Sequence, residues 1–99
     1  MAIFAVTTVR GPAWDPERGV RQQAGWDEHA AFMDGLVQRG HVVLGGPIGG
    51  EGDEVALLAM RAEDAAAIRD LFADDPWSAS GVLSVGEIRA WTIWLGSIG

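Results

Sequence analysis

Apolar residues recur along the chain with two different periods, and the changes of period mark the expected elements. Residues 2–9 form a continuous apolar run, rich in β-branched side chains, that is typical of a strand and ends at a Gly-Pro pair. From residue 25 to residue 39 the apolar positions recur every three or four residues, which predicts an amphipathic helix that Gly40 ends as a left-handed cap. Residues 41–46 then predict a short strand.

The second half of the chain repeats this alternation. Residues 49–53 have the composition of a turn, residues 54–60 that of an apolar strand, and residues 63–73 the spacing of a second helix. Residues 83–95 predict the last and longest strand. The expected order is therefore strand, helix, strand, strand, helix, strand, and residues 10–24 form a charged loop whose role the pattern leaves open.

This order predicts an α+β fold of the ferredoxin-like type, in which a four-stranded antiparallel sheet carries two helices on one face. The first strand is apolar on both sides, and the expected last strand places Trp91 and Trp94 on opposite sides. Two helices cover only one face, so we expect the other face to meet the sheet of a second copy in a homodimer. The alternative is an edge strand that simply exposes its aromatic side chains.

Composition and charge narrow the partners. The 99 residues are 48% hydrophobic with a mean hydropathy of +0.13, which indicates one globular domain spanning residues 1–99. The net charge of −7 repels phosphate backbones, which makes nucleic acid an unfavourable partner. The seven basic residues, all Arg, form no cluster along the chain that would bind an anionic membrane. The apolar start lacks the basic flank of a signal peptide and is too short to span a bilayer, so we expect a cytoplasmic protein that binds neither nucleic acid nor membrane.

The same composition argues against metal and cofactor chemistry. The chain has no Cys, and His29 and His41 are its two imidazoles, which excludes disulfides and thiolate nucleophiles and makes a metal site poor. The Gly-rich run at residues 45–52 has no Lys and matches neither a phosphate-binding loop nor a dinucleotide fingerprint. We therefore expect no metal and no cofactor.

Two polar residues at expected element boundaries are candidates for chemistry. His29 lies on the apolar face of the first helix between Trp26 and Phe32, so its ring points inward and is partly desolvated. On spacing alone, a core histidine that donates to a backbone carbonyl explains it. Asp75 precedes Pro76 and is placed to cap a short turn, and capping alone explains that residue as well.

Four short motifs, taken in order and spacing, resemble the YciI-like (YCII-related) family over most of the chain. They are Trp-Asp-Glu-His-Ala-Ala-Phe at 26–32, Gly-Gly-Pro at 45–47, Ala-Asp-Asp-Pro-Trp-Ser-Ala-Ser-Gly at 73–81 and Glu-Ile-Arg-Ala-Trp at 87–91. The resemblance implies a ferredoxin-like fold, a dimeric α/β barrel and an active site built on a His/Asp pair, which by position is His29 and Asp75. Family members more often have Phe or Tyr in place of Trp77, which implies a differently shaped pocket.

The resemblance also implies a chemistry. One similar type of protein removes chloride from a chlorinated hydroxyquinol, and the related muconolactone-isomerase-like barrels shift protons on small ring compounds. We therefore expect a lyase or isomerase that acts on a small cyclic or enol substrate, with His29 as general base and Asp75 orienting it.

The remaining site residues follow from the same expectation. The residues expected to bind the substrate are Trp26, Phe32, Gly46, Trp77 and Ser78. The Ser78 hydroxyl and the backbone amides of residues 76–80 are expected to donate to an oxyanion. Two alternatives stay open: a non-catalytic dimer that binds a small ligand in the same pocket, and a purely structural dimer in which His29 and Asp75 serve the fold.

Overall fold

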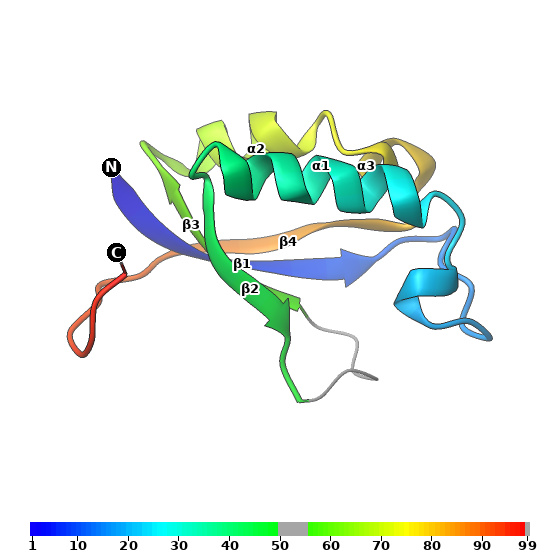
Figure 1. Ribbon diagram of the computed structural model, residues 1–99, viewed down its shortest axis with the longest axis horizontal. Helices are drawn as coiled ribbons and strands as arrows, with labels where there is room; N and C mark the ends of the chain where they lie inside the picture. The colour runs from blue at the N-terminus through cyan, green and yellow to red at the C-terminus, as the bar shows by residue number, and fades with distance from the viewer. Residues whose placement is uncertain (50–55, 99) are drawn as a thin grey trace.

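A four-stranded antiparallel sheet carries all the α-helices of the described chain on one face (Figure 1). The computed structural model describes residues 1–49 and 56–98. Its strands lie in the order β2-β3-β1-β4, which confirms the ferredoxin-like α+β fold. The elements are β1 (Ala2–Arg10), a 3-10 helix η1 (Val20–Gln22), α1 (Trp26–Gln38), β2 (Val42–Pro47), β3 (Ala56–Ala62), α2 (Ala65–Phe72), α3 (Pro76–Ser80) and β4 (Leu83–Ala90).

The main core lies between the inner face of the sheet and the helices. In the β1–β3 register Phe4 is opposite Met60 and Val6 is opposite Leu58, so these side chains point together toward the helices. Apolar side chains of the helices form the other half of the core. The buried cluster consists of Phe4, Val6, Leu36, Val42, Leu58, Met60, Ala62, Ile68 and Phe72.

The helices begin and end where capping chemistry allows. Gly25 precedes α1 with a φ of 80°, and Gly40 follows it with the same φ, as expected of a left-handed cap. The Asp64 carboxylate caps α2 by accepting from the Ala67 amide at 2.8 Å. The turn expected over residues 76–80 is a short helix, α3, with Asp75 at its N-cap.

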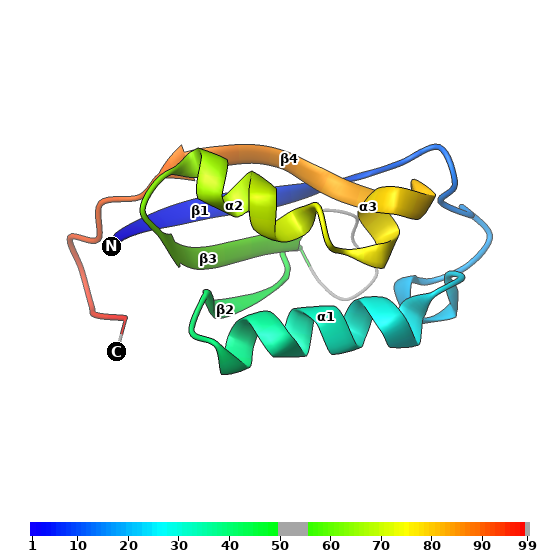
Figure 2. The ribbon, with the colours of Figure 1, turned by 90° about the horizontal axis from the view of Figure 1, so that it is seen from above.

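Figure 2 shows α1 on one side of the inner face and α2 with α3 on the other. The packing agrees with this view, since α1 contacts β2 whereas α2 and α3 contact β4. The described chain has no helix long and apolar enough to cross a membrane. The turn expected over residues 49–53 lies, apart from Gly49, outside the described residues.

The prediction that the last strand reaches residue 95 is wrong. β4 ends at Ala90, one residue before the Trp91 amide donates to the Ile3 carbonyl at 2.9 Å. Ala90 is opposite Phe4 and β1 begins at Ala2, so β1 offers the chain beyond Ala90 at most two more positions to pair with. Trp94 is 88% exposed, and it lies in an irregular tail rather than on one side of a strand.

The loop between β1 and α1 is attached to the rest of the fold at several points. The Gly11 amide donates to the Val82 carbonyl at 3.0 Å. Farther along, the buried Gln23 side chain donates to the carbonyls of Asp15 (2.8 Å) and Arg18 (3.0 Å) and accepts from the Asp15 amide at 2.9 Å. These bonds replace the regular ladder that the segment lacks. We refer to residues 11–24 as the Gln23-anchored loop.

Gly11 is expected to be essential to this attachment. A Cβ on Gly11 would overlap the Gly81 carbonyl oxygen and lie 2.7 Å from its carbon, and backbone cannot yield as a side chain does. Gly11→Ala should therefore lower the free energy of unfolding by about 1–3 kcal/mol in a urea titration. The matched control is Gly35→Ala inside α1, which should raise it by about 0.5–1 kcal/mol. Equal stability of the two variants would contradict the close approach.

Candidate active site

His29 and Asp75, 46 residues apart in the chain, form a buried pair. The His29 Nδ1 lies 2.9 Å from Asp75 Oδ1 and 3.0 Å from Oδ2. The histidine comes from the first turn of α1 and the aspartate from the N-cap of α3, so the pair bridges the two helical halves of the inner layer. The structure thus brings together the two residues that the sequence singles out as catalytic candidates.

Asp75 is held by more than the histidine. Its Oδ1 also accepts from the Trp77 amide at 3.0 Å, and its own amide donates to the Phe72 carbonyl at 3.0 Å. Pro76 occupies the first position of α3, where its missing N–H costs nothing. The capping role and the pairing with His29 are therefore two uses of one carboxylate. A buried carboxylate bonded to donors on both sides has a fixed orientation.

The imidazole of His29 is also fixed by aromatic packing. Its ring stacks on the indole of Trp77 at a centroid distance of 4.0 Å and an interplanar angle of 9°, and Trp26 lies tilted against both rings. Trp77 is itself buried, and its Nε1 donates to the Ala24 carbonyl at 2.7 Å. Because Nδ1 faces Asp75, Nε2 is the ring nitrogen left for a ligand, and within residues 1–49 and 56–98 it has no partner.

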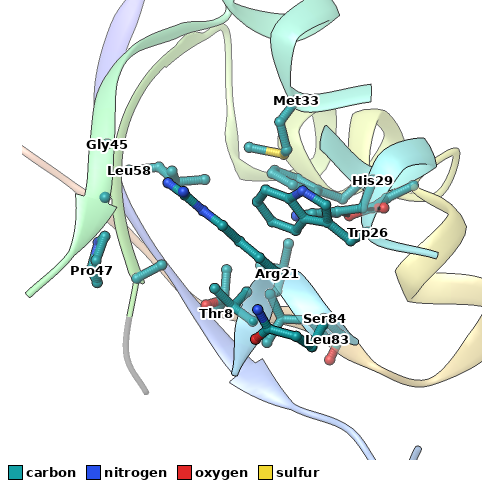
Figure 3. Close-up of a pocket in the computed structure, with 17 residues that line it drawn as sticks. Thr8, Arg21, Trp26, His29, Met33, Gly45, Pro47, Leu58, Leu83 and Ser84 are labelled. Atoms are coloured by element: carbon teal, nitrogen blue, oxygen red, sulfur yellow. Dashed lines mark hydrogen bonds and ion pairs between the residues drawn. The ribbon is translucent and has the colours of Figure 1, made fainter. Parts of the chain in front are cut away.

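His29 and Asp75 lie on the wall of a cavity of about 500 Å³ (Figure 3). That volume is within the range of small-molecule sites. The cavity is enclosed by α1, the Gln23-anchored loop and the inner face of the sheet, and its walls are mainly apolar. Its described lining residues are Thr8, Val20, Arg21, Gln22, Trp26, His29, Met33, Gly45, Gly46, Pro47, Ala56, Leu58, Phe72, Asp75, Leu83, Ser84 and Val85.

The five residues expected to bind substrate are distributed over three places. Trp26 and Gly46 line the cavity. Trp77 lies behind the His29 ring, and Phe32 packs against Phe72 at a centroid distance of 5.9 Å in the main core. Ser78 lines a separate, smaller hollow of about 230 Å³. The structure therefore keeps Ser78, Phe32 and Trp77 off the described wall of the cavity.

The amides at the start of α3 do not form the expected oxyanion site. The Trp77 amide donates to the Asp75 carboxylate, and those of Ser78 and Ala79 donate to the Asp75 carbonyl at 3.0 and 3.4 Å. These donors are already satisfied within the helix start. Apart from His29 and Asp75, the polar residues of the described lining are Arg21 and Gln22 of the loop, Thr8 of β1 and Ser84 of β4.

The sequence left open what this loop contributes to the site. Arg21 and Gln22 belong to η1, which no periodicity announces because three residues are too few to show one. The composition held one signal for a role of arginine, since all basic residues of this acidic chain are Arg. Within the described residues, no three His, Cys, Asp or Glu side chains gather as metal ligands.

The pair fixes which nitrogen of His29 carries the proton. A carboxylate only accepts hydrogen bonds, so the neutral imidazole should be protonated on Nδ1 and carry its lone pair on Nε2. Long-range proton–nitrogen NMR, recorded at a pH at which the ring is neutral, should show this tautomer in the wild type. In Asp75→Asn the amide can turn its NH₂ toward Nδ1, so the Nε2–H tautomer should become populated while α3 keeps a capping residue.

His41 is the internal control, because it belongs to no such pair in the described structure and should keep its signals in the variant. A wild-type His29 protonated on Nε2 would contradict the assigned geometry.

Comparison with known proteins assigns the chain to a family. No curated protein and no solved structure gives a significant match to this chain. The family model of the YCII-related domain matches residues 11–92, a span that contains the Gln23-anchored loop, His29, Asp75 and almost all of the cavity lining. That span is most of the 99 residues and includes the motifs on which the resemblance was based. The chain therefore belongs to the YCII-related family.

Proposed function

We propose that this protein is a small-molecule enzyme of the lyase or isomerase type, in which His29 removes a proton from a small cyclic or enol substrate. The observation that carries the proposal is the Asp75–His29 pair on the wall of an apolar cavity of about 500 Å³. A histidine that serves only the packing of the core does not need a cavity beside it. A histidine with one nitrogen held by a carboxylate and the other left toward a cavity has the arrangement that general bases require.

The proton transfer follows from the tautomer. Asp75 accepts a hydrogen bond from the Nδ1–H of His29, which leaves the Nε2 lone pair to take a proton from a substrate carbon or hydroxyl, and the nearby carboxylate stabilises the imidazolium that forms. The electron pair left on the substrate moves into an adjacent carbonyl as an enolate. In an isomerisation the imidazolium then returns the proton to a different carbon. In an elimination the enolate electron pair forms a new double bond, chloride leaves with the electron pair of the C–Cl bond, and the imidazolium releases its proton to water.

The cavity supports a small, mostly apolar and planar substrate. Trp26 offers an indole face, and Met33 and Leu58 offer flexible apolar contacts on other sides. General acid–base catalysis contributes about 10²- to 10⁴-fold to a rate, so groups that stabilise the enolate are also needed. Gln22 and Ser84 are polar lining residues that can donate to it.

The second candidate is a non-catalytic module that holds a small ligand in the same cavity. The low exposure of His29, 9%, together with its stacking on Trp77, favours this alternative, since a tightly packed ring also serves as a rigid wall. The two functions differ in one measurable respect. A base exchanges substrate protons with solvent, whereas a binding wall does not.

We also propose that the protein acts as a homodimer formed through the outer face of the sheet. No helix of the described chain covers that face (Figure 1). Leu44 is opposite Ala59, which in turn is opposite Ala5, so all three lie on the outer face, and Leu44 is 59% exposed. An apolar sheet face that no helix of the described chain covers supports association with a second sheet.

Proton removal by His29 is testable without knowing the product. Enolisable lactones, cyclic 1,3-diketones and hydroxyquinols are incubated with the protein in D₂O, and loss of their C–H signals is followed by proton NMR. The wild type should accelerate exchange for at least one class. His29→Gln should lower that rate at least about 100-fold, because its amide can still donate to Asp75 but cannot take up a proton. His29→Ala should be equally inactive.

His41→Gln is the matched control and should exchange at the wild-type rate, and circular dichroism should show each variant folded. Exchange that persists in folded His29→Gln would rule out His29 as the base. Saturable binding without exchange in the wild type would favour the second candidate.

Dimerisation through the outer face predicts an asymmetry between two exposed apolar residues. Leu44→Glu puts a charge on the outer face and should convert the dimer to a monomer in light-scattering measurements after size exclusion. Val37→Glu puts the same charge on α1, where Val37 is 52% exposed, and should leave the mass unchanged. A wild-type monomer, or a dimer that only Val37→Glu dissociates, would contradict the proposed interface.

A further inference from the structure

The charged side chains of the cavity wall differ in whether the protein provides them with a hydrogen-bond or ion-pair partner. The charged or titratable residues of the described lining are Arg21, His29 and Asp75. Asp75 and His29 bond to each other, and Asp75 also bonds to the Trp77 amide. Arg21 has no hydrogen bond, ion pair or ring contact to any part of the chain that the structure describes. The cavity therefore presents one cation whose partner is not supplied by the described protein.

The position of Arg21 is fixed by its surroundings although its side chain is exposed. The backbone of η1 is held because the Gln23 side chain, directly after it, bonds back to the carbonyls of Asp15 and Arg18 before it. The Ala24 carbonyl, next along the chain, accepts from Trp77 Nε1 at 2.7 Å. Arg21 thus projects from a segment tied to the same tryptophan on which His29 stacks. Figure 3 shows its side chain extended across the cavity toward the side formed by Gly45 and Leu58.

The other arginine of this loop makes the contrast clear. Arg18 does not line the cavity, and its Nε lies 3.4 Å from the Asp15 carboxylate at the surface. Arg18 is therefore neutralised locally by the protein, as expected in a chain with a net charge of −7. A guanidinium that instead extends unpaired over apolar walls is placed to bind a ligand, because such walls strengthen a charge-assisted hydrogen bond relative to water.

From these observations we infer that the ligand of the cavity is a small planar organic acid whose carboxylate binds the Arg21 guanidinium while its ring or enol portion lies against Trp26 and reaches His29. A guanidinium matches a carboxylate through two parallel N–H bonds. One cation suits a singly charged carboxylate better than a doubly charged phosphate ester, for which the described lining offers no second cation. The inference rests on the proposed function only in assigning the cavity to the substrate.

The inference is tested by binding rather than by turnover, so that its outcome is independent of proton removal. The probes are benzoate, salicylate and 2-furoate, each compared with its neutral primary amide. Binding is followed from the indole N–H signal of Trp26 in proton–nitrogen NMR spectra, since Trp26 lines the cavity. At least one acid should bind at least about tenfold more tightly than its amide. Added NaCl should weaken the binding of the acid and leave the binding of the amide unchanged.

Substitution of the arginine should remove this preference. Arg21→Gln should weaken the acid at least about tenfold while leaving the affinity for the amide unchanged, and Arg21→Lys should recover part of the loss. Arg18→Gln is the matched control in the same loop and should bind like the wild type. Tight binding of phenyl phosphate in place of the carboxylates would overturn the choice of a carboxylic acid.

The inference is also wrong if the acids and amides bind equally, if Arg21→Gln leaves acid binding unchanged, or if none of the three acids shifts the Trp26 signal. Failure of the proposed catalysis looks different. In that case Arg21-dependent binding of the acid persists while no substrate proton exchanges with D₂O, and the protein is a binding module for organic acids.

Discussion

The Asp75 carboxylate is the group on which the arrangement of the site depends. It is 3% exposed, and a buried carboxylate is tolerated only when donors surround it, because an unpaired one costs several kcal/mol. Two donors meet this requirement, the Trp77 amide at the start of α3 and the Nδ1 of His29 on α1. The need to satisfy one charge therefore fixes the distance between the two halves of the helical layer. The cavity lies beside this pair, and both residues line it.

The same constraint extends to the loop through Trp77. Its amide binds the carboxylate, its indole face supports the imidazole of His29, and its Nε1 binds the Ala24 carbonyl. One side chain thus connects the acid, the base and the segment that carries Arg21. This explains why an aromatic residue larger than Phe is accommodated here, since the indole N–H satisfies a loop carbonyl that a phenyl ring would leave unbonded.

The sequence predicted the features that depend on residues close together in the chain better than those that depend on residues far apart. The order of the elements along the chain and the helix caps followed from local signals, the spacing of apolar residues and the positions of Gly40 and Asp75. The pairing of His29 with Asp75 was expected only through the family resemblance, since no local pattern relates residues 46 positions apart. The last strand was predicted too long because its length is set by its neighbour β1 rather than by its own residues. The sequence did not decide which arginine of the loop lines the cavity, because hydrogen bonds of Gln23, rather than periodicity, shape that segment.

The negative charge of the whole chain and the positive charge of Arg21 act on an anionic ligand at different distances, so the two do not conflict. A net charge of −7 repels anions from afar, but at physiological ionic strength this field decays within about 8 Å. Among the described residues that line the cavity, the guanidinium of Arg21 is the cation without a partner, and the apolar walls reduce screening there. A small monoanion is weakly repelled and would gain this contact. A polyanion is repelled in proportion to its charge and would find one cation in the described lining, so the inferred site favours small, singly charged acids.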